Sequence, residues 1–101
     1  MVSFNKVLKN IIETISADIK SKPSQKCDGY NIMEYHVTFK GSDVIVDYNM
    51  DTRKIVVSST KTSEKITIIV PVYGQLVIRH KNIHDNSIMK NILNDVFKMA
   101  E

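Results

Sequence analysis

The sequence predicts an α+β domain of two layers, in which an N-terminal helix and a C-terminal helix cover one face of an antiparallel meander of four or five strands. Apolar residues recur every three or four positions at both ends of the chain and every second position between them. Short turn-forming segments separate the alternating stretches, which favours antiparallel neighbours. The chain has 101 residues, the length of one domain, so residues 1–101 are expected to fold as a single unit.

The first predicted element is an amphipathic helix over residues 4–20, because its apolar residues fall at helical spacing. Ser3 is suited to cap its start, and Pro23 prevents its continuation. The same spacing returns over residues 86–100, where Asp85 or Asn86 is expected to cap a second helix. The sequence therefore predicts helices at both ends of the chain.

Between the helices, residues 23–29 have the composition of a connection that ends in an Asp-Gly turn pair. The stretches that follow alternate with a period of two, which predicts strands over residues 30–40, 44–50, 54–60 and 64–72. Residues 75–80 form a fifth strand if Gly74 makes a turn, or the tail of the fourth if Gly74 makes a bulge.

One alternating set of strand residues is consistently apolar, and we expect it to face the helices. Its members are Met33, Tyr35, Val37, Phe39, Val44, Val46, Tyr48, Met50, Ile55, Val57, Ile66, Ile68, Val70, Leu76 and Ile78. The opposite set should be polar, because it faces solvent. Yet each strand also places one aliphatic residue on that face, namely Ile32, Ile45, Val56, Ile69 and Val77.

A contiguous apolar patch on an open sheet face usually marks an interaction site. If the strand register aligns the five aliphatic residues, they form such a patch, and we expect them to bind a protein partner. A homodimer formed sheet to sheet is the simplest use of the patch, and pairing of free sheet edges is the other route. Scattered β-branched residues on a strand surface are the alternative explanation, since these residues favour strands.

The sequence contains no motif that predicts an enzyme. Its three glycines are widely separated turn residues, so it has no glycine-rich phosphate loop, and the serine-hydrolase and zinc-protease motifs are absent. His36, His80, His84 and Cys27 lack the spacing of a zinc site. We expect no catalytic activity, metal, cofactor or small-molecule substrate.

Nucleic-acid binding is the alternative function that the charge pattern favours. The formal net charge is +3, and Lys61, Lys65, Arg79 and Lys81 supply a basic stretch. Clustered cations bind phosphates by releasing counterions. Against this reading, the chain has two arginines, the residue that base recognition favours, and most of its aromatic residues are expected to face inward.

The longest apolar run, over residues 68–73, is too short for a membrane helix, which needs about 20 residues. No secretory pattern begins the chain, and one cysteine allows no internal disulfide, so we expect a cytoplasmic protein. Abundant Ile, Lys and Asn, which AT-rich codons encode, fit low-GC bacteria, their phages, some large DNA viruses and AT-rich eukaryotes. The sequence thus favours a small accessory, adaptor or inhibitor protein, in the host cytoplasm if it is viral.

Overall fold

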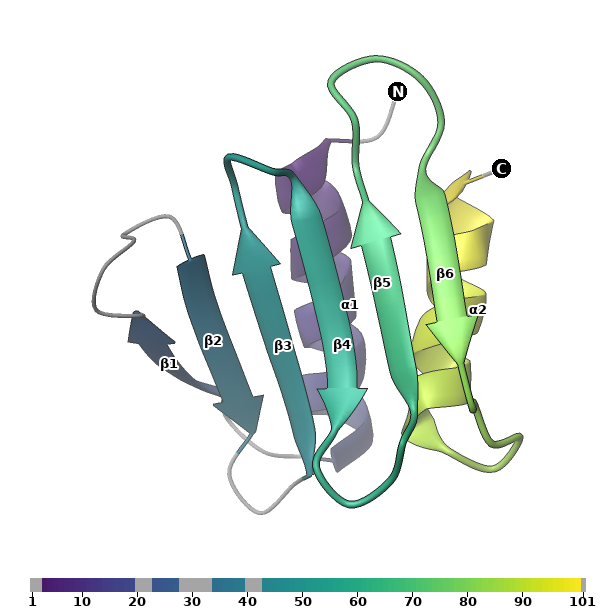
Figure 1. Ribbon diagram of the computed structural model, residues 1–101. Coiled ribbons are helices and arrows are strands. Elements are labelled where there is room, and N and C mark those ends of the chain that lie inside the picture. Colours follow the sequence, from purple (N-terminus) through teal and green to yellow (C-terminus); the bar gives the residue numbers. More distant parts are fainter. Residues whose placement is uncertain (1–2, 20–22, 28–33, 40–42, 101) are drawn as a thin grey trace.

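Two helices and six strands make up the computed structural model, which describes residues 3–19, 23–27, 34–39 and 43–100. The elements in chain order are α1 (Phe4–Ile19), β1 (Pro23–Cys27), β2 (Glu34–Phe39), β3 (Val44–Asn49), β4 (Lys54–Ser59), β5 (Lys65–Ile69), β6 (Val77–Lys81) and α2 (Ile88–Ala100). The strands form one antiparallel sheet in the order β1-β2-β3-β4-β5-β6. Both helices lie behind this sheet (Figure 1), which confirms the predicted α+β class.

Each helix starts at a serine. The Ser3 Oγ accepts a hydrogen bond from the Lys6 N–H at 3.2 Å, which confirms the predicted cap of α1. The predicted cap of α2 is wrong, because the Ser87 Oγ, rather than Asp85 or Asn86, accepts from the Met89 N–H at 3.1 Å. The helix therefore begins two residues later than its apolar spacing suggested.

The two helices run side by side and close the core against the sheet. Thr14 donates from its Oγ1 to the Asp95 Oδ2 at 2.9 Å, and the Asn10 Nδ2 lies 3.3 Å from the Met99 Sδ. Apolar residues of both helices, of β2–β5 and of the position that follows β5 are buried between the layers: Phe4, Val7, Ile11, Ile15, Val37, Phe39, Val44, Val46, Ile55, Val57, Ile66, Ile68, Val70, Met89, Ile92, Leu93 and Val96.

The sheet has one strand more than the sequence predicted, because residues 23–27 pair with β2 rather than forming a connection. Pro23 is compatible with this strand because it is the first residue of an edge strand. Gly74 has φ +103° and lies between β5 and β6, so β6 is a separate strand and not a tail of β5.

Most of the expected inward-facing residues are buried, but Met50 is not. It lies in the turn after β3 and is exposed, because the strand ends at Asn49 and the alternation stops there. Tyr48, Leu76 and Ile78 are only partly buried against the core. Met33 and the side chain of Tyr35 lie outside the described part of the chain.

Candidate binding surface

The face of the sheet away from the helices is the surface on which seven of the nine predicted site residues lie. Strand register arranges its side chains in three rows that cross the sheet from β3 to β6. The first row is Ile45, Ser58, Lys65 and Lys81. The second is Asp47, Val56, Thr67 and Arg79, and the third is Asn49, Lys54, Ile69 and Val77.

Four of the five aliphatic residues predicted to bind a partner come together in these rows. Ile45, Val56 and Ile69 occupy successive strands one row apart, so they are diagonal neighbours with Cα atoms about 7–8 Å apart. Val77 lies directly opposite Ile69. Ile32 lies outside the described residues. We call these four residues the apolar strip.

The strip is most accessible where it reaches the loop between β5 and β6. Val77 is 41% exposed, whereas Ile45, Val56 and Ile69 are half-buried by their neighbours. In the loop beside it, Val72 is 58% and Tyr73 is 81% exposed. We call Val72, Tyr73 and Val77 the apolar end.

Val72 and Tyr73 were not predicted as site residues, because the alternating pattern placed Val72 at the end of a strand over residues 64–72 and assigned Tyr73 to no element. Pro71 and Gly74, which flank them, are the sequence signal that could have identified a loop. A partner that covered the exposed Val72 and Tyr73 side chains would remove their apolar area from water, which favours binding.

Arg53 fastens the neighbouring β3–β4 turn to the end of β5. Its backbone has φ +57°, a left-handed conformation that costs free energy in residues other than glycine. Its Nε donates to the Val70 carbonyl, its own carbonyl accepts from the Val70 N–H at 2.9 Å, and its guanidinium lies 5.9 Å from the centre of the Phe4 ring. These contacts offset the backbone cost and hold the start of the loop that carries the apolar end.

Three of the four predicted basic residues, Lys65, Arg79 and Lys81, form a second feature of the open face, which we call the cationic cluster. Lys65 and Lys81 are direct cross-strand partners, and Arg79 is two residues from Lys81 on the same face. With Thr67 and His80 they line a shallow depression of about 180 Å³.

The cationic cluster is not neutralised within the described part of the chain, where none of its three side chains forms an ion pair. Like charges directly opposite each other on a sheet are destabilising. An anionic group placed over the cluster would relieve this repulsion, so the arrangement favours an anionic ligand.

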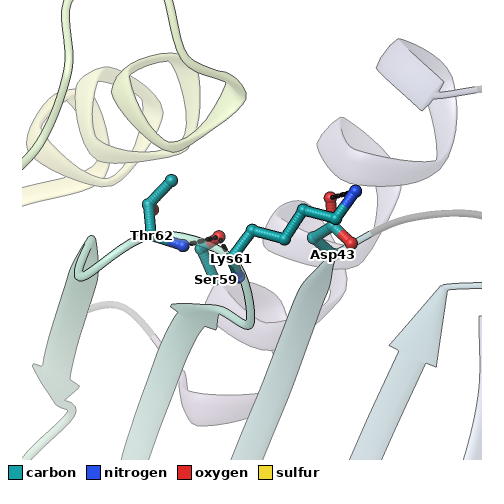
Figure 2. Close-up of polar contacts among 4 residues, drawn as sticks. All are labelled: Asp43, Ser59, Lys61 and Thr62. Carbon is teal, nitrogen blue, oxygen red and sulfur yellow. Dashed lines mark hydrogen bonds and ion pairs between the residues drawn. The ribbon is translucent and has the colours of Figure 1, made fainter.

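Lys61, the fourth predicted basic residue, lies apart in the β4–β5 turn. Its Nζ is 3.5 Å from the Asp43 Oδ2, and the Ser59 Oγ accepts from the N–H groups of Lys61 and Thr62 at 3.3 and 3.2 Å (Figure 2). Asp43 already balances the charge of Lys61, so this lysine has a structural partner that the cationic cluster lacks.

Glu64 is a buried carboxylate that sequence reasoning did not single out. Its side chain is 5% exposed; its Oε1 accepts from the Thr62 Oγ1 at 2.9 Å and its Oε2 from the His84 N–H at 3.2 Å. Burial raises the pKa of Glu64, but hydrogen bonds from Ser87, His84 and Thr62 and the nearby His84 ring outweigh it and hold the pKa below 4.5. The ionised carboxylate thus joins the β4–β5 turn to the start of α2.

Among the described residues, no three His, Cys, Asp or Glu side chains gather as metal ligands would. His80 instead packs against Phe97, with ring centroids 6.1 Å apart. Neither described helix has the length and apolarity needed to cross a membrane. Comparison of the chain with protein-family models, with curated proteins and with solved structures gave no match.

Proposed function

We propose that the protein acts without catalysis, by binding another protein through the open face of its sheet. The observation that carries the proposal is the placement of the apolar end beside a cationic cluster that has no counter-ion in the described residues. Apolar area supplies the affinity of such a contact, and charge supplies its selectivity and its association rate.

The partner that this surface fits is acidic as well as apolar. Arg79 and Lys81 would meet carboxylates, while Tyr73 and Val77 would meet aliphatic or aromatic side chains. Tyrosine and arginine are the residue types that most often dominate binding energy at protein interfaces. A partner without acidic groups would leave the repulsion between Lys65 and Lys81 in place.

Selection of peptides from a random library displayed on phage tests the proposal directly. We expect the wild-type protein to enrich peptides that combine apolar and acidic residues. These peptides should bind the double variant Val72→Ser/Tyr73→Ser about tenfold or more weakly, because the exposed apolar area is lost. Gln75→Ser, an exposed polar change in the same loop, is the matched control and should bind them as the wild type does.

Two results would oppose the proposal. One is a library that yields no enriched peptide. The other is a set of enriched peptides that bind the double variant as tightly as the wild type, since they would then recognise some other surface.

Nucleic-acid binding is the second candidate, and the cationic cluster is the observation that favours it. Three cations on phosphates predict a slope of log affinity against log salt of roughly −2 to −3. Fluorescence anisotropy with a labelled DNA duplex measures this slope. Arg79→Glu should abolish the binding and Lys54→Glu, on the same face but outside the cluster, should weaken it much less.

The setting that we propose is the cytoplasm, that of the host if a phage or virus encodes the protein, with an accessory or inhibitory role. The single Cys27 and the AT-rich composition support this setting. A homodimer formed through the apolar strip is the simplest alternative complex, and light scattering on the wild type and on Ile69→Lys tests it.

A further inference from the structure

β6 is an edge strand with little protection. It pairs with β5 on one side, and on its other side no described residue pairs with its backbone. Four of its five residues are exposed, and α2 lies behind it (Figure 1). A free edge offers a row of backbone N–H and C=O groups to which an extended chain can add as a further strand.

The side chains of β6 make pairing with a second copy of β6 unfavourable. Arg79 and Lys81 lie on the open face, and Lys65 stands next to Lys81 on β5. If two copies of β6 paired with each other, Arg79 and Lys81 of one copy would lie close to Arg79 and Lys81 of the other. Like charges across a strand pair are destabilising. The same charges attract a strand that carries carboxylates on alternate residues, because alternate residues share one face.

The other face of the free edge is aromatic. The His80 ring packs edge-on against Phe97 of α2, at 6.1 Å and 86°, and Phe97 is exposed. An added strand would therefore meet cations through one set of its side chains and an aromatic ring through the other. Acidic residues alternating with apolar residues satisfy both faces at once.

We propose that β6 is a docking edge, at which an extended segment of a partner protein, with acidic and apolar residues alternating, adds to the sheet as a seventh strand. This inference rests on the proposed function and specifies both the partner segment and the way it binds. A nucleic acid would use the cationic cluster, but it would leave the backbone groups of β6 and the exposed Phe97 ring unused.

The experiment uses a capped ten-residue peptide in which Glu alternates with Val, and the same peptide with methyl groups on its backbone nitrogens. The two carry identical charge and side chains, but the methylated one cannot donate backbone hydrogen bonds. We expect fluorescence anisotropy to show binding of the first and at least about tenfold weaker binding of the second. Amide hydrogen exchange of residues 77–81 should slow when the first peptide binds.

Charge-reversal variants identify the site. Arg79→Glu/Lys81→Glu should lose the peptide, whereas Lys54→Glu, an exposed lysine of the same face outside the cationic cluster, should bind it within about twofold of the wild type. Both cluster residues are exposed, and unchanged thermal unfolding would show that the variants are folded.

Three outcomes overturn the inference. Equal binding of the two peptides would mean attraction by charge alone. Tighter binding of a ten-nucleotide oligothymidine than of the peptide, lost in the same double variant, would assign the cationic cluster to nucleic acid. Absence of peptide binding would remove strand addition, while library peptides that depend on Val72 and Tyr73 would still leave the proposed function standing.

Discussion

The carboxylate of Glu64 joins the β4–β5 turn, the segment before α2 and the residue that caps α2. Glu64 is the only charged residue among the described ones whose side chain is buried, and its oxygens accept from Thr62 and His84. It also lies at the N-terminus of α2, where a negative charge is favourable because of the helix dipole. The carboxylate thus substitutes for apolar packing where the β4–β5 turn meets the last helix.

Replacement of Glu64 by Gln tests this role through pH. At pH 7 we expect the free energy of unfolding to fall by about 1–2 kcal/mol, because charge-assisted hydrogen bonds become neutral ones. The pKa of Glu64 in the folded state lies below its ordinary value of 4.5. The stabilisation by the ionised carboxylate is therefore complete above pH 4.5 and is lost as the pH falls through the lowered pKa. Urea denaturation between pH 7 and pH 2 measures the difference between variant and wild type.

The control for this series is Glu13→Gln, which removes an exposed carboxylate on α1. Its stability should follow that of the wild type within about 0.5 kcal/mol at every pH. A Glu64→Gln variant whose deficit stayed constant down to pH 2 would contradict the assigned pKa direction.

Arg53 and Asn82 share a left-handed backbone, with φ +57° in both, but they should respond differently to glycine. Arg53→Gly relieves the backbone but removes the Val70 hydrogen bond and the contact with Phe4, so we expect a net loss of about 1 kcal/mol. Asn82→Gly removes only a 3.4 Å contact with the Ser63 carbonyl and should stay within about 0.5 kcal/mol of the wild type. Thermal unfolding compares the two, and equal effects would show that backbone strain alone decides at both positions.

At the scale of the element, α2 depends on its cap. The Ser87 Oγ accepts from the Met89 N–H and hydrogen-bonds the Glu64 carboxylate, so its loss affects both the helix and the carboxylate. We expect Ser87→Ala to cost about 1 kcal/mol in unfolding free energy and to raise the pKa of Glu64. Asn86→Ala, at an exposed position with no cap contact, should be nearly neutral, and the reverse order in urea denaturation would restore Asn86 as the cap.

The elements that could be predicted are those whose pattern reflects burial of one face. Both helices and β2–β5 follow from periods that core packing imposes on their residues. β1 could not be predicted, because its five residues, PSQKC, have no apolar alternation and become a strand only by pairing with the edge of β2. Helix starts were predictable to within two residues, since Ser87, Asn86 and Asp85 are all good caps and tertiary contacts with Glu64 favour one of them.

At the scale of the whole molecule, the open face was predictable in part. Alternation placed Ile45, Val56, Ile69 and Val77 away from the helices, but their arrangement as a strip depends on register, which the sequence leaves open. Register also brings Lys65 and Lys81 together and leaves Lys61 with Asp43. Tyr73 was not predicted as a site residue, because apolar residues continue from the strand into the loop and therefore do not mark where the strand ends.

Self-association through the apolar strip is the prediction that belongs to the whole molecule. We expect the mass measured by light scattering to rise with protein concentration towards that of a dimer. Ile69→Lys should remain a monomer, because a lysine at the middle of the strip would have to be buried. Asn91→Lys, which adds the same charge at an exposed position of α2 behind the sheet, is the comparison variant and should leave the dimer intact. A wild-type protein that stays monomeric at the highest concentration would remove self-association and leave foreign partners as the ligands.

The meander joins only strands that are neighbours in sequence, whereas α1 and α2 meet across residues more than eighty positions apart. During synthesis, each hairpin can therefore form as soon as it leaves the ribosome, whereas α2, one of the two helices that cover the sheet, is made after all six strands. A nascent chain that has emerged only as far as β6 has a complete sheet, but α1 alone covers the apolar face. Chaperones that recognise exposed hydrophobic surface should accordingly bind this chain until α2 has emerged and packed against the sheet.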